Sequence, residues 1–205
     1  DNNWNRPIYF GVTVAPTSML NLDNYLQMEG LAYRLVNNSN NVINQNKISD
    51  NLLSFIGEKS WFNDYDSNKD NEVTKYVSNN YQRGYIYRNL ANKDVYVDPQ
   101  LGRLVQNYRT GFVRLSISHY LDKDFQKAES ALLKMEEIMP SSIIPIPSKQ
   151  LQYQIAQVYN GVGNQDQMKY HMKELIQRKD LELEDYILYE KILPKIGKVY
   201  KTVYF

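Results

Sequence analysis

The sequence contains no cysteine and only two histidines among its 205 residues. The lack of cysteine excludes disulfide bonds, thiol catalysis and cysteine-based zinc sites, and it fits a cytosolic or a periplasmic protein equally well. The formal net charge is only +1, so the chain has no long-range field that would attract nucleic acid or an anionic membrane. No apolar run approaches the roughly 20 residues that span a bilayer. We therefore expect that the chain binds no nucleic acid and does not itself cross a membrane.

Motifs that carry common enzyme chemistry are also lacking. The sequence has no nucleophile elbow, no phosphate-binding loop and no zinc motif. His119 is expected at an inward helix position, as a core histidine. His171 is expected on the outer part of a helix, with no partner at metal-ligand spacing. We therefore expect no catalytic residue, no cofactor and no metal, and the chain by itself is not interpreted as an enzyme.

The acidic stretch 63–72 has some features of a metal-binding loop. Acidic and amide side chains alternate through it, as they do in the first half of a calcium-binding loop. That loop needs a glycine at its sixth position and a bidentate acid at its twelfth, where Lys69 and Lys75 stand instead. We interpret the stretch as a solvated surface loop, and calcium binding is the alternative left open.

Residues 112–140 predict two antiparallel helices joined by a short charged turn. Small residues, Ser116 and Ala128, are expected where the two helix backbones come closest. The order of bulky, small and aromatic residues, ending at Pro140, matches the tetratricopeptide pattern. Apolar residues at helical spacing define the two inner faces: Phe112, Leu115 and His119 on the first, and Ala128, Leu132 and Met135 on the second.

A second hairpin is predicted after residue 149. The pair Leu115 and Ser116 recurs 40 positions later as Ile155 and Ala156, and Gly163 supplies the turn. A single repeat cannot bury its own apolar face, so the two hairpins are expected to pack together. A last amphipathic helix is predicted at 183–193.

The first third of the chain has a different pattern. Segments 8–14 and 31–36 are rich in β-branched and aromatic residues and predict strands, with a helix at 20–29 between them. Strand, helix and strand suggest a small parallel βαβ unit. The Asn-rich segment 37–50 predicts a loop, and 51–62 a helix.

The expected fold class is therefore α+β and mainly α. A small N-terminal βαβ element is followed by tetratricopeptide-like antiparallel helical hairpins. We expect an N-terminal α/β subdomain with an Asn/Asp-rich insertion at 1–98, and a tetratricopeptide-like helical subdomain at 99–205.

The hairpin register also predicts a binding surface. In stacked hairpins the first helix of each pair lines the concave side, and its outward residues meet the ligand. Aromatic, apolar and amide groups at these positions suit an extended peptide better than a phosphate. The alternative that these residues pack on the N-terminal unit or on the last helix, and leave no open groove, stays open. The candidate residues are Val113, Ile117, Tyr120, Tyr153, Gln157 and Asn160.

Four segments carry a resemblance to a known family. WNRPIYFGVTV (4–14), NYLQMEGLAYRLV (24–36), RNLANKDVYVD (88–98) and QNYRTGFVRLS (106–116) are similar to the C-terminal soluble region of a bacterial membrane-protein family of formerly unknown function. Members of that family resemble the eukaryotic transmembrane protein O-mannosyltransferase, with a many-helix glycosyltransferase core followed by a tetratricopeptide-like tail. The catalytic acid and the lipid-linked sugar site of such enzymes belong to the membrane core, so the resemblance transfers no catalytic residue to this chain.

The resemblance implies a non-catalytic accessory domain on the periplasmic or extracytoplasmic face. It would be tethered to the inner membrane through a missing N-terminal part, and the chain indeed begins at Asp1 rather than Met. The implied partners are an acceptor protein or peptide and, in cis, the parent transmembrane core. The alternative is a free-standing tetratricopeptide adaptor for protein–protein interaction.

Overall fold

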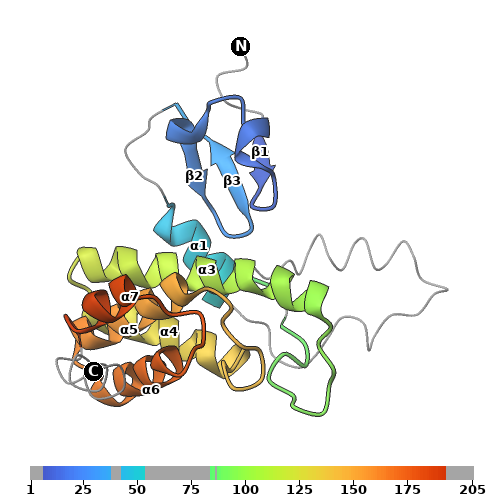
Figure 1. Ribbon diagram of the computed structural model, residues 1–205. Coiled ribbons are helices and arrows are strands. Elements are labelled where there is room, and N and C mark those ends of the chain that lie inside the picture. Colours follow the sequence, from blue (N-terminus) through green and yellow to red (C-terminus); the bar gives the residue numbers. More distant parts are fainter. Residues whose placement is uncertain (1–6, 38–42, 54–83, 86, 193–205) are drawn as a thin grey trace. The chain divides into compact units, whose positions relative to one another are not determined.

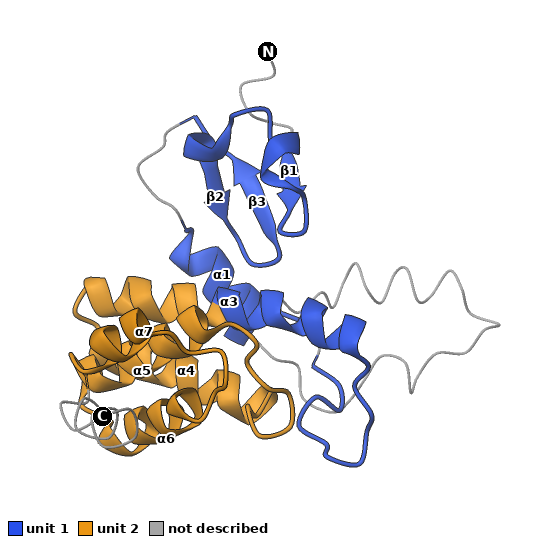
Figure 2. Cartoon of the chain, in the orientation of Figure 1, with its two compact units in different colours: residues 1–111 blue, residues 112–205 orange. Residues whose placement is uncertain are grey.

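The computed structural model of the chain consists of two compact units, residues 1–111 and 112–205 (Figures 1 and 2). The structure describes residues 7–37, 43–53, 84–85 and 87–192. The units divide inside the long helix α3 (Pro99–Leu121), whereas the sequence placed a boundary before that helix, at 98/99. The acidic stretch 63–72, with its open calcium alternative, lies outside the described residues.

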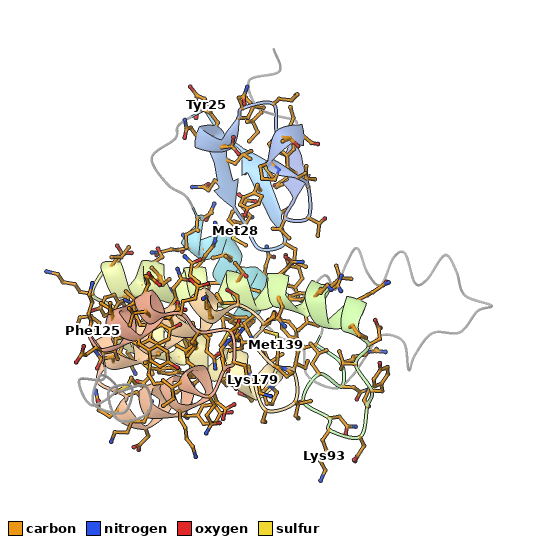
Figure 3. The ribbon with its side chains drawn as sticks, in the orientation of Figure 1. Tyr25, Met28, Lys93, Phe125, Met139 and Lys179 are labelled. Atoms are coloured by element: carbon orange, nitrogen blue, oxygen red, sulfur yellow. The ribbon has the colours of Figure 1, made fainter. Side chains whose placement is uncertain are left out.

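Unit 1 contains a three-stranded antiparallel sheet with the order β1-β3-β2. The central residue Tyr33 pairs with Phe10 on one side and with Met28 on the other. Met28, labelled in Figure 3, is only 1% exposed. The strands are β1 (Tyr9–Gly11), β2 (Leu26–Met28) and β3 (Ala32–Leu35). The predicted strands at 8–14 and 31–36 thus belong to one sheet.

The expectation of a parallel βαβ unit is wrong, because all three strands pair antiparallel. Residues 20–29 form no α-helix. Leu20 and Asn21 have φ values of 55° and 57°, which exclude a right-handed helix at the start of this segment. Two short 3₁₀ turns, Pro16–Ser18 and Asp23–Tyr25, and then β2 occupy this part of the chain. Gly30, with φ of 125°, turns the chain back at once, and so short a connection can join only antiparallel strands.

Helix α1 (Gln45–Leu53) begins inside the segment expected to be a loop. Asn44 caps it, since its Oδ1 accepts a hydrogen bond from the Lys47 amide at 3.2 Å. Ile48 and Leu52 are four residues apart and both buried, so one turn of apolar spacing outweighs the Asn-rich composition. The predicted helix 51–62 lies outside the described residues beyond Leu53.

Unit 2 is built from helical hairpins, as predicted. Its helices are the last part of α3, α4 (Phe125–Ile138), α5 (Lys149–Val162), α6 (Gln165–Ile176) and α7 (Leu183–Tyr189). The Ser116 hydroxyl donates to the Ala128 carbonyl at 2.6 Å, which confirms the predicted close approach of α3 and α4. Gly163, with φ of 88°, ends α5, and Asn164 caps α6. The fold class α+β, mainly α, is confirmed, while the tetratricopeptide assignment stays a prediction.

Replacing Ala128 with Leu should lower the free energy of unfolding by about 1–3 kcal/mol, because overpacking a tight helix contact forces the backbones apart. Ala128 is 0% exposed. The exposed Ser130, on the same helix, provides the control variant Ser130→Leu, which should change stability by less than about 0.5 kcal/mol. Urea unfolding followed by circular dichroism measures both, and equal losses would contradict the assignment. The apolar spacing excluded Ala131 from the buried stripe, but Ala131 is also 0% exposed. Helix α4 contacts both α5 and α3.

Candidate groove for an extended ligand

An open groove of about 470 Å³ lies in unit 2. Its walls are the end of α3, the exposed side of α5 and the residues that follow α7. Five of the six residues predicted to bind a ligand line it: Ile117, Tyr120, Tyr153, Gln157 and Asn160. The structure thus brings together residues of two different hairpins that lie far apart in the sequence.

Val113 does not line the groove, and the expectation that it points outward is wrong. It is 1% exposed, and its neighbours Phe112, Leu115 and Ser116 are 0% exposed. This part of α3 is therefore covered on more than the single face that helical periodicity predicts. One turn beyond Val113, Ile117 is half-buried and reaches the groove.

Tyr120 forms one wall because of a glycine that faces it. A Cβ atom built on Gly161 would lie 2.5 to 2.7 Å from the outer atoms of the Tyr120 ring. Only glycine therefore lets this ring lie directly against the backbone of α5. The Phe125 ring, 5.5 Å away, packs on the same tyrosine. A glycine inside a predicted helix was the sequence signal for this close approach.

Tyr153 both lines the groove and holds α7. It is 5% exposed, its hydroxyl donates to the Leu188 carbonyl at 3.0 Å, and its ring centroid lies 5.0 Å from that of Tyr189. Burial raises the pKa of Tyr153, and a hydrogen bond with Gln157 offsets part of that rise. For this residue the alternative of packing on the last helix is therefore correct, although the side chain also reaches the groove.

Amide side chains provide the polar surface of the groove. Gln157 and Asn160 are exposed, and the Asn160 amide oxygen accepts from the Gln165 side chain at 3.4 Å. Gln154 and Lys191 also line the groove, and neither is among the residues predicted from the sequence. Gln154 lies one turn before Gln157, a spacing that could have found it. Lys191 gave no such signal, because the predicted last helix continued through it.

The lining residues of the groove are mainly amides, tyrosines and aliphatic side chains. None of the lining residues in the described part of the chain is a carboxylate, histidine or serine. No group of three or more His, Cys, Asp or Glu residues placed to hold a metal ion occurs in the described ranges. Amides that can donate and accept, together with tyrosine faces, can hold an extended chain by its main-chain groups and side chains.

His171 was expected on the outside of its helix, and this expectation is wrong. It is 0% exposed, because it lies between Met168 and Met172 on the buried face of α6. Its ring stacks on Tyr159 at 5.6 Å, and its Nε2 lies 3.9 Å from Glu136 Oε1. Glu136 also accepts from the Ser141 amide at 2.9 Å. These contacts tie three helices together inside unit 2.

His119 occupies the inward position that the sequence predicts. It is 9% exposed. Burial lowers its pKa, and the Asp124 carboxylate partly opposes this effect. Neither histidine lines the groove.

The described helices include none with the length and apolar character required of a membrane span. No curated protein and no solved structure matches the chain. One family model does match, over residues 1–52 out of 205. Those residues contain the three-stranded sheet and all but the last residue of α1. The N-terminal quarter of the chain is thus similar to the domain described as TMEM260-associated domain 2.

Proposed function

We propose that this chain is a non-catalytic, extracytoplasmic binding part of a TMEM260-like, protein O-mannosyltransferase-like membrane protein. In this proposal the helical unit holds an extended segment of an acceptor protein in the groove. The match of residues 1–52 to a TMEM260-associated domain supports the membrane-protein context. The resemblance of the later segments to the soluble tail of that kind of protein supports the same context.

The observation that carries the binding role is the groove itself. Five of the six residues chosen from helix register alone come from α3 and α5 and line one open volume of about 470 Å³. That volume is within the range of about 300–1,000 Å³ that is common for ligand sites. Exposed amides on α5 can pair with the N–H and C=O groups of an extended peptide, and the Tyr120 ring offers an apolar face to its side chains.

A test should block the groove without unfolding the unit. In the variant Gly161→Ala the added methyl pushes the Tyr120 ring away from α5 and into the groove. The added Cβ would meet only outer atoms of the Tyr120 side chain, and the better helix propensity of Ala offsets part of the cost of moving them. The free energy of unfolding should therefore change by less than about 1 kcal/mol. Fluorescence anisotropy with a labelled pool of extended peptides of mixed composition should show binding weakened about five- to tenfold, the value of one aromatic contact.

The control variant is Gly102→Ala. A Cβ atom there meets nothing within 4 Å, and Gly102 lies in unit 1, so the affinity for the peptide pool should stay at the wild-type value. Binding that is equally strong in Gly161→Ala would place the peptide outside the groove. No binding by the wild-type chain would refute the peptide-binding role.

The alternative, a free-standing adaptor, differs in one observable feature. If the chain is part of a membrane protein, the open reading frame that encodes it contains several hydrophobic spans upstream of Asp1. An adaptor has none. We favour the membrane protein because the family model that matches residues 1–52 describes an associated domain of such a protein.

A further inference from the structure

The groove carries a positive charge with no negative charge to balance it among its described lining residues. Lys191 is the charged side chain there, and the polar neighbours Gln154, Gln157 and Asn160 are neutral. Neutral amides bind a peptide main chain regardless of the charge of its side chains. Discrimination between acidic and basic ligands therefore depends on Lys191.

Three other lysines of unit 2 have a carboxylate partner that Lys191 lacks among the described residues. Lys127, Lys134 and Lys149 each lie within 2.6 to 2.8 Å of a carboxylate, so their charges are compensated within the unit. Lys191 is exposed and forms no ion pair with any residue in the described part of the chain. Its ammonium group can therefore pair with a carboxylate of a ligand.

We propose that the groove selects acidic peptide segments, in which an Asp or Glu side chain pairs with Lys191. The main chain of the segment would lie along the amides of α5, and its apolar or aromatic side chains would pack on Tyr120. This inference rests on the proposed function, because it assigns a charge to the occupant of the same groove.

The expected selectivity is modest. An ion pair in contact with solvent changes an equilibrium constant by up to about fivefold. We therefore expect an acidic segment to bind about two- to fivefold more tightly than a neutral one, with a preference that decreases at high salt.

The experiment compares three peptide pools on the complete 205-residue chain. The pools share a random background of Ala, Ser, Thr and Tyr, and their fixed positions contain Asp, Gln or Lys. Dissociation constants come from fluorescence anisotropy at low and at physiological salt. The wild-type chain should bind the Asp pool best. Lys191→Gln should equalise the three pools, and Lys191→Glu should favour the Lys pool.

The matched control is Lys169→Glu, which makes the same change in net charge at an exposed position of α6 outside the groove. It should leave the order of the pools unchanged. Three pools of equal affinity would overturn the charge assignment while the peptide-binding role stands. No binding of any pool would refute both. An equal effect of Lys169→Glu would overturn the role of Lys191. The proposal would also be overturned if the wild-type chain dimerised with increasing concentration and Lys191→Glu did not, because the groove would then bind a second copy of the chain.

Discussion

The variant Tyr153→Ala should lose about 3–5 kcal/mol of unfolding free energy, the cost of deleting a buried aromatic side chain. The side chain is 5% exposed, packs on Tyr189 and bonds to the Leu188 carbonyl. Its loss leaves a cavity between α5 and α7 and removes the attachment of α7 at this end. Urea unfolding followed by far-ultraviolet circular dichroism measures the effect.

Two further tyrosine variants separate the causes. Tyr153→Phe keeps the ring and removes only the hydrogen bond to Leu188, so it should cost about 0.5–1.5 kcal/mol. Tyr96→Ala removes a side chain that is 82% exposed and should change stability by less than about 0.5 kcal/mol. If Tyr153→Ala were as mild as Tyr96→Ala, the residue would be a surface contact for ligands and not part of the core of unit 2.

The variant Gly30→Ala should destabilise unit 1 by roughly 2–6 kcal/mol, the sum of backbone strain and overpacking. Gly30 has φ of 125°, where an L-residue with a side chain is strained, and an added Cβ would collide with the Tyr85 hydroxyl. That hydroxyl accepts a hydrogen bond from the Leu31 amide at 2.8 Å. The substitution thus disturbs both the β2–β3 turn and its contact with Tyr85.

Hydrogen exchange of the β3 amides measures this loss within unit 1. Gly102→Ala is the matched control, since its Cβ meets open space and Ala favours a helix over Gly by about 0.5–1 kcal/mol. Exchange rates in β3 that stay at the wild-type value in Gly30→Ala would show that the turn has another conformation.

Helical periodicity predicted the helical hairpins of unit 2, because the sequence signals for these hairpins are local. The turn before Phe125, the small residues Ser116 and Ala128 and the αL glycine Gly163 each act within a few residues of the chain. The pattern failed where burial comes from several neighbours at once. Val113 and His171 are covered on faces that a single stripe leaves open, and only the packing of several helices determines this.

Unit 1 was harder to predict because its structure depends on contacts distant in sequence. The β2–β3 turn is held by Asn51, whose side chain donates to the Glu29 carbonyl, and by Tyr85. Both lie outside the segment 20–29, whose pattern suggested a helix between two parallel strands. The strand propensities located β1 and β3, but strand direction depended on the tight turn at Gly30. In the groove, sequence register found five lining residues on α3 and α5 but missed Gln154, while Lys191 lies beyond the end of α7.

The double role of Tyr153 links the occupancy of the groove to the position of α7. Helix α7 has seven residues, of which only Tyr189 is buried, and a helix of this length is not stable in isolation. Its attachment depends on contacts such as the 2.6 Å pair of Lys149 with Asp185 and the bond from Tyr153. If only a fraction of molecules has α7 attached, the apparent dissociation constant of a ligand that needs it rises by the reciprocal of that fraction. Such a ligand increases the attached population, and by reciprocity each contact that fastens α7 increases the affinity of the groove.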